Sequence, residues 1–167
     1  MWREILDKFK RYPAQEKVVR LILERGFQVS ERGRVVSGGI EIPHAQIAQE
    51  LEVDRRVVDT TASAIVEDEL LWKIFKNVRP MTFLPEVAPV MGLGVIEITP
   101  VDAAQTGLLG EVASAVAGYG LSIRQAVSDD PYFVERPKLT IITEAKIPGD
   151  LVRILMDIQG VRRVTVY

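Results

Sequence analysis

Three prolines close together divide this chain of 167 residues into two parts. Pro80, Pro85 and Pro89 each lack a backbone N–H donor and push the preceding residue toward extended geometry. Neither a regular helix nor a central strand fits around them, whereas each flanking segment has the length of a small domain. We therefore predict an N-terminal module over residues 1–79, a stiff linker over 80–91 and a C-terminal domain over 92–167.

The C-terminal part alternates strand-like and helix-like patterns. The predicted elements are a strand at 93–99, a helix at 107–117, strands at 121–128 and 138–144, a helix at 149–158 and a strand at 161–167. The order β-α-β-β-α-β predicts a ferredoxin-like, four-stranded antiparallel sheet with both helices on one face. Along the second strand, alternation places Ser122, Arg124 and Ser128 on one face and Ile123 and Val127 on the other.

The N-terminal part is predicted to be mainly helical. Helical spacing covers residues 2–12 and 13–25, and a hairpin-like turn at 27–36 and a short strand at 40–42 follow. Two further helices, at 44–51 and 55–69, flank a tight turn in which Asp54 can cap the second helix. Residues 71–75 and 81–84 are predicted as two strands around a basic turn. A helix-turn-helix (winged-helix-like) module is therefore expected here, and an α+β class for the whole chain.

Residues 43–69 resemble a helix-turn-helix, since their apolar spacing packs two helices across a tight turn, although Glu52 stands where glycine is usual. The resemblance implies DNA binding by the exposed face of the second helix. That face is predicted to consist of Arg55, Arg56, Asp59, Thr60 and Ser63, and the basic turn would add Lys73 and Lys76 on backbone phosphate.

The local charge supports a different interpretation of the same module. Residues 44–69 hold two Lys or Arg and seven Asp or Glu, which is the wrong sign for a phosphate-lined groove. Residues 1–36, by contrast, hold nine Lys or Arg and five Asp or Glu, which favours DNA. The module is thus either a DNA reader or a docking module for another protein.

Composition argues against catalysis and against a metal site. The chain has no cysteine and one histidine, His44, which follows Pro43 at a helix start and is predicted to be a capping or surface residue. No nucleophile and base converge, so we expect no catalytic residue, no metal, no cofactor and no enzyme activity. The longest run without a charged residue, 112–123, is shorter than the ~18 residues of a membrane span, so a cytoplasmic protein without a membrane partner is expected.

The C-terminal part resembles the ACT domain family. The segment Ile96-Glu-Ile-Thr-Pro-Val-Asp-Ala-Ala-Gln-Thr-Gly-Leu-Leu-Gly-Glu-Val is similar to the strand, polar loop and Gly-Leu-Leu helix that open such domains. Tyr119-Gly-Leu-Ser-Ile is similar to the entry into their second strand. The family implies a regulatory module that binds amino acids or related metabolites, usually at an interface between paired domains. Joined to a helix-turn-helix, it resembles predicted regulators of amino-acid metabolism.

The polar loop is the predicted ligand site. The family's Asp-x-Pro-Gly is Ala104-Gln105-Thr106-Gly107 here, and Asp102 lies two residues early. The free N–H groups of a helix start suit an anionic group. The predicted ligand-binding residues are Asp102, Gln105, Thr106, Gly107, Leu108, Ser122 and Arg124. Alternatively Thr106 caps the helix and Gly107 permits a tight turn, and Arg124 is a surface residue.

These features predict a metabolite-sensing regulator with allosteric control of transcription. A small effector, an amino acid or related metabolite, binds the C-terminal domain and controls DNA binding by the N-terminal module. The alternative is an allosteric subunit that docks onto a metabolic enzyme without binding DNA. We also expect a homodimer through the C-terminal domain, because residues 161–167 form a strand at an edge of the sheet.

Overall fold

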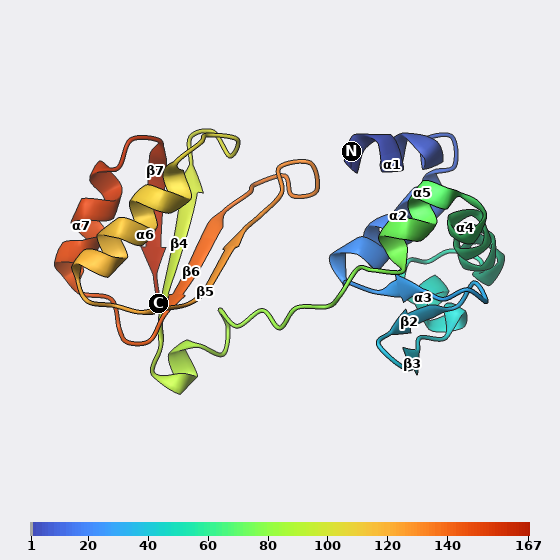
Figure 1. Ribbon diagram of the computed structural model, residues 1–167, viewed down its shortest axis with the longest axis horizontal. Coiled ribbons are helices and arrows are strands. Elements are labelled where there is room, and N and C mark those ends of the chain that lie inside the picture. Colours follow the sequence, from blue (N-terminus) through green and yellow to red (C-terminus); the bar gives the residue numbers. More distant parts are fainter. Residues whose placement is uncertain (1) are drawn as a thin grey trace. The chain divides into compact units, whose positions relative to one another are not determined.

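The computed structural model describes residues 2–167, with side chains from Glu4 onward. The chain splits into two compact units, Met1–Thr82 and Phe83–Tyr167 (Figure 1). The division lies inside the proline-rich segment 80–91. Along the described residues, no helix is long and apolar enough to cross a membrane. The mixed α+β class is confirmed.

The N-terminal unit packs helices around a small antiparallel sheet, β1-β2-β3. Its elements are α1 (Trp2–Phe9), α2 (Pro13–Glu24), β1 (Gln28–Val29), β2 (Val35–Ser37), β3 (Ile40–Glu41), α3 (His44–Glu50), α4 (Arg55–Glu67) and α5 (Glu69–Phe75). Its core contains Val18 and Ile22 of α2, Val58 and Ile65 of α4, and Phe75 of α5, all fully buried. This core holds α4 by one face and leaves the opposite face exposed.

Gly26 ends α2 and lets the end of the unit pack against it. Its φ is +65°, in the region that favours glycine, and a Cβ at this position would lie 2.6 Å from the Cα of Pro80. Because backbone occupies that space, no side chain fits there. Residues 79–80 thus belong with the N-terminal unit.

The predicted strands at 71–75 and 81–84 are wrong. Residues 69–75 form α5, which Asp68 caps by accepting hydrogen bonds from the N–H groups of Leu70 and Leu71, both at 3.0 Å. Leu71 and Phe75 are buried at helical spacing, so this short apolar run has the period of a helix and not the predicted period of a strand. Of the two lysines of the predicted basic turn, Lys73 therefore lies on α5 and Lys76 directly follows it.

The C-terminal unit has the predicted ferredoxin-like topology, with antiparallel strand order β5-β6-β4-β7. Its elements are the 3-10 helix η1 (Pro89–Met91), β4 (Gly94–Pro100), α6 (Leu108–Gly118), β5 (Ile123–Ser128), β6 (Leu139–Thr143), α7 (Gly149–Asp157) and β7 (Val161–Val166). Figure 1 shows α6 and α7 against one face of the sheet, where Ile98, Ile141, Val112 and Leu155 are fully buried.

The other face of the sheet is partly covered by the segment that precedes β4. Leu84, Ala88 and Leu93 pack against Val95 and Ile142 there. The second half of the proline-rich segment is thus part of the C-terminal unit, a role that proline's rigidity alone did not predict.

Two irregularities in the sheet change where its side chains point. The register shifts between Ile123 and Gln125 in β5, and between Thr99 and Pro100 where β4 meets β7. Beyond the first shift, Val127 pairs with Thr140 and Ser128 pairs with Leu139. Ser128 therefore faces the helices and Val127 the opposite side, so the predicted common face of Ser122, Arg124 and Ser128 is wrong. The extra residue of a bulge reverses the alternation after it.

Candidate functional site

The helix-turn-helix consists of α3 and α4, joined by a tight turn with a left-handed residue. Glu52 has φ +53°, in the place where the pattern usually has glycine. Asp54 then caps α4, as predicted, by accepting a hydrogen bond of 2.8 Å from the N–H of Arg56. The turn geometry of the motif is therefore present although its usual glycine is absent.

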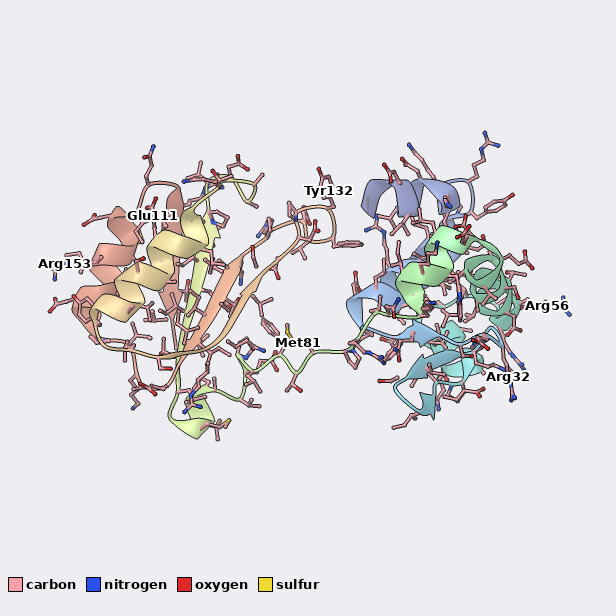
Figure 2. The ribbon with its side chains drawn as sticks, viewed as in Figure 1. Arg32, Arg56, Met81, Glu111, Tyr132 and Arg153 are labelled. Atoms are coloured by element: carbon pink, nitrogen blue, oxygen red, sulfur yellow. The ribbon has the colours of Figure 1, made fainter. Side chains whose placement is uncertain are left out.

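The exposed face of α4 carries the predicted DNA-contacting residues. Val58, Thr61, Ala62 and Ile65 are buried, whereas Arg55, Arg56, Thr60 and Ser63 are exposed. The hydroxyl of Thr60 donates to the carbonyl of Arg56 at 2.8 Å and accepts from Nε2 of Gln15 at 3.3 Å. Arg55 and Arg56 occupy the first turn of the helix, and Figure 2 shows Arg56 pointing outward from the unit.

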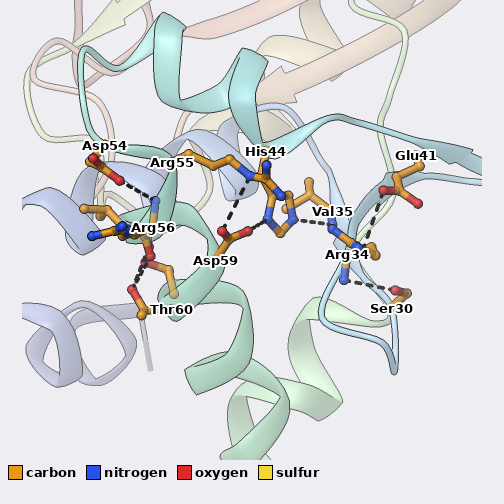
Figure 3. Close-up of polar contacts among 12 residues, drawn as sticks. Ser30, Arg34, Val35, Glu41, His44, Asp54, Arg55, Arg56, Asp59 and Thr60 are labelled. Carbon is orange, nitrogen blue, oxygen red and sulfur yellow. Dashed lines mark hydrogen bonds and ion pairs between the residues drawn. The ribbon is translucent and has the colours of Figure 1, made fainter.

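His44 connects the small sheet to α4 (Figure 3). Its side chain is 3% exposed and does not cap α3, so the prediction of a capping or surface residue is wrong. The N–H of Val35 can only donate, so Nε2 of His44 accepts from it at 3.3 Å, and the proton of the neutral ring lies on Nδ1. Nδ1 in turn donates to Oδ1 of Asp59 at 2.6 Å.

Asp59 thus has a structural role that the sequence did not reveal. Besides the bond from His44, its Oδ2 lies 3.6 Å from Nε of Arg55. The hydrogen bond from His44 lowers the pKa of the Asp59 carboxyl, the charges of Arg55 and Arg34 lower it further, and burial opposes them. The carboxylate therefore holds Arg55 at the start of α4.

Most of the acidic residues near α4 are engaged in similar contacts. Oε1 of Glu50 lies 3.9 Å from a guanidinium nitrogen of Arg25. Asp54 caps α4, and Asp68 both caps α5 and forms an ion pair with Lys8. Of the seven acids in 44–69, only Glu52 and Glu67 have no cap or ion pair among the described residues. Five of the seven acids are thus engaged in caps or ion pairs within the unit, and of the two acids on α4 only Glu67 is exposed without such a contact among the described residues.

Lys73 and Lys76 do not form a basic hairpin. Lys73 lies on α5 and pairs with Glu69 at 2.5 Å, and the Nζ of Lys76 lies 5.8 Å from the centre of the Trp72 ring. The real hairpin is the β1–β2 turn, which carries Arg32 and Arg34.

Arg32 and Arg34 are functional candidates that the sequence analysis missed. Nε of Arg34 lies 3.8 Å from Oε1 of Glu41. The positive charge of Arg34 also contributes to lowering the pKa of the Asp59 carboxyl on α4. Arg32 is exposed and points outward (Figure 2). The sequence did contain a signal for this basic hairpin, namely two arginines that flank Gly33 in a predicted turn.

The predicted ligand loop is held by its own side chains. Asp102 accepts a hydrogen bond of 2.9 Å from the N–H of Ala104, and Gln105 donates one of 3.0 Å to the carbonyl of Gln159. Gly107 stands at the start of α6 with φ +87° and no side-chain cap is formed, while Thr106 is exposed and Leu108 buried. The interpretation of Thr106 as a helix cap is therefore wrong, and that of Gly107 as a turn residue is confirmed.

The structure does not bring Ser122 and Arg124 to this loop. Ile123, between them, pairs with Thr143, which pairs with Gly94 at the start of β4. The loop follows Pro100, at the opposite end of β4. Arg124 is exposed and has no ion pair among the described residues. The predicted site residues thus fall into two groups at opposite ends of the sheet.

Two hollows border the loop. The smaller, of about 80 Å³, is lined by Gln105, Leu108 and neighbours, and is well below the ~300 Å³ of typical ligand pockets. The larger, of about 610 Å³, is lined by none of the predicted ligand residues. Within residues 2–167, no three His, Asp or Glu side chains are grouped so that they could hold a metal ion.

Comparison with known proteins finds no matching family model and no matching curated protein. The chain is similar to the solved structure of the transcriptional regulatory protein PF0864 from Pyrococcus furiosus, a member of the ASNC family. The identity is 9%, 92% of this chain and 85% of that chain are covered, and the TM-score is 0.28. PH0061 is 11% identical, with 92% and 88% covered and a TM-score of 0.27. Similarity at these TM-scores establishes no common family, so function has to be inferred from the chain's own residues.

Proposed function

We propose that this protein is a DNA-binding regulator whose C-terminal unit binds a small effector. The observation that carries the proposal is the first turn of α4. It presents Arg55 and Arg56 on an exposed face, and Asp54 and Asp59 hold that turn in place. Exposed arginines at the start of the second helix of a helix-turn-helix are placed to contact base edges.

The hairpin extends this surface. His44 ties β2 to α4, because it accepts a hydrogen bond from the N–H of Val35 and donates one to Asp59. We assign contacts with backbone phosphate to Arg32 and Arg34 in place of Lys73 and Lys76, because His44 ties the hairpin to α4, whereas Lys73 lies on α5 and Lys76 follows it. Thr60 and Ser63 complete the exposed face of α4.

The effector is assigned to the end of the C-terminal sheet where residues 101–107 follow β4. The ferredoxin-like topology and the resemblance to ACT domains support a regulatory role for this unit. The last strand, β7, is an edge strand, and pairing of this edge between two copies would satisfy its free backbone groups. We therefore propose a homodimer, which sedimentation of the full chain measures directly.

DNA selection with the full chain tests the proposal. Duplexes enriched from a random pool should share a sequence, and the affinity for them should fall steeply with salt. The Arg55→Ala/Arg56→Ala variant should lose the sequence preference, since base contacts specify and phosphate contacts position. Each lost base contact is worth about 1–3 kcal/mol.

A matched control removes the same number of charges from the same unit. The Lys73→Ala/Lys76→Ala variant should keep the sequence preference and lose little affinity. If both double variants behave alike, α4 is not the reader. If the wild-type chain enriches no sequence and binds no duplex at low salt, the docking-subunit alternative replaces this proposal.

A further inference from the structure

A basic hollow lies at one end of the C-terminal sheet. It has a volume of about 610 Å³ and is bordered by β4 and the residues after it, by the segment before β6, and by the start of β7. Its charged lining residues are Glu135, Arg136, Lys138, Arg162 and Arg163. Thr99 adds a hydroxyl, and Val101 and Pro137 add apolar surface.

The sheet irregularity explains why two neighbouring arginines line one hollow. Arg163 pairs with Thr99 and Val161 pairs with Pro100, so β7 has one residue more than β4 at this point. In a regular strand, Arg162 and Arg163 would point to opposite faces. The bulge removes this alternation and allows both side chains to border the same space.

The positive charge of this hollow is not neutralised inside the protein. Lys138 is paired with Glu97, at 2.7 Å, but Arg136, Arg162 and Arg163 have no ion pair among the described residues. Glu135 is the one acid in the lining. Because all three guanidinium groups are exposed, water weakens their mutual repulsion, and an anion between them would turn that repulsion into attraction. Arginine is also the residue best suited to bidentate binding of carboxylate or phosphate.

We propose that this hollow binds a small organic anion with two or more negative charges, such as a phosphorylated or polycarboxylate metabolite. The volume falls within the ~300–1,000 Å³ of small-molecule sites. That the anion acts as the effector rests on the proposed function, whereas its binding does not. A neutral zwitterion leaves most of the positive charge unmatched, so the site favours multiply charged anions over simple amino acids.

Calorimetric titration of the full chain with pyrophosphate, citrate and leucine, at constant ionic strength, tests the ligand class. Pyrophosphate or citrate should bind more tightly than leucine, and which of the two binds better identifies phosphate or carboxylate as the recognised group. The Arg162→Gln/Arg163→Gln variant should weaken binding by at least tenfold, ~1.4 kcal/mol. Arg153→Gln is the control for loss of a positive charge elsewhere in the same unit, because Arg153 is exposed on α7 and lies outside the hollow, and it should leave anion binding unchanged.

The results separate this inference from the proposed function. If neither anion binds in the millimolar range, or if Arg153→Gln weakens binding as much as the double variant does, the site is refuted while DNA binding by α4 stands. If the double variant lowers the affinity for DNA without any anion present, the hollow contacts DNA, and the inference is again wrong. If the anion binds in the hollow of a chain that binds no DNA, the site stands and the proposed regulator fails.

Discussion

The two units of this protein use their charges in opposite ways. Around α4 in the N-terminal unit, acids are engaged in caps and pairs, as Asp54 and Asp59 show, and the exposed face is left to arginines. In the C-terminal unit, Arg136, Arg162 and Arg163 line a hollow without an ion pair among the described residues. The sequence around α4 is acidic and the C-terminal half is acidic as well, yet Arg56 in the first and Arg136, Arg162 and Arg163 in the second are exposed and have no ion pair among the described residues. Net charge over a segment therefore does not indicate which charges are free to bind a partner.

The largest expected change in unfolding free energy comes from truncating a buried side chain in the core of one unit while the core of the other unit is left intact. Phe75→Ala removes a fully buried ring from the N-terminal core and should cost about 3–5 kcal/mol of that unit's stability. Both tryptophans, Trp2 and Trp72, lie in the first unit, so their fluorescence during urea unfolding reports that unit. Hydrogen exchange of β4 and β6 reports the other.

The matched variant is Leu155→Ala, which truncates a fully buried side chain of the C-terminal core and should cost about 2–5 kcal/mol there. We expect it to leave the tryptophan transition unchanged and to lower the protection of β4 and β6, and we expect Phe75→Ala to do the reverse. If either variant shifts both signals equally, the two units unfold as one cooperative body, and the comparison between them loses its basis.

The sequence predicted the C-terminal fold better than the N-terminal one, for a physical reason. Its elements carry their own period and clear stop signals, such as Pro100 at the end of β4 and Gly160 between α7 and β7. The run 71–75 carries neither, because a short apolar run suits a strand and a helix equally. The cap from Asp68 and the burial of Leu71 and Phe75 on one side show that the run is a helix.

The candidate sites were less accessible to prediction because they depend on contacts between distant segments. The exposed face of α4 followed from helical spacing alone, so Arg55, Arg56, Thr60 and Ser63 were placed correctly. The bond between His44 and Asp59, by contrast, joins two helices. The basic hollow joins three segments and needs a bulge that no local pattern announces.

The starts of α4 and α6 provide a smaller and sharper comparison. Asp54 caps α4 with its side chain, whereas α6 begins at Gly107 without a side-chain cap. Asp54→Ala should therefore cost about 1 kcal/mol, and Thr106→Ala should stay within about 0.5 kcal/mol. Urea unfolding measures both. Equal costs would mean that Thr106 does cap its helix or that the Asp54 bond adds nothing.

The smallest effect concerns acid. The pKa of Asp59 is lowered from its ordinary value of 3.8, first by the hydrogen bond from His44, and that of Asp68 is lowered first by its hydrogen bond from Lys8. Because the unfolded chain binds these protons at higher pH than the folded chain, both groups stabilise the N-terminal unit above pH ~4. This contribution is lost as the pH falls through the lower pKa values of the folded state.

Asp59→Asn tests this directly, since asparagine still accepts the bond from His44 but cannot ionise. The side chain of Asp59 is 42% exposed, so water screens its interactions and the effect should be small. At neutral pH the variant should be less stable than the wild type by tryptophan fluorescence, and the difference should shrink as the pH falls below 3.8, where the unfolded wild-type chain takes up the proton. At each pH, hydrogen exchange of the C-terminal strands should be the same in the variant and in the wild type. A difference that stays constant with pH would show that the carboxylate charge does not stabilise the first unit.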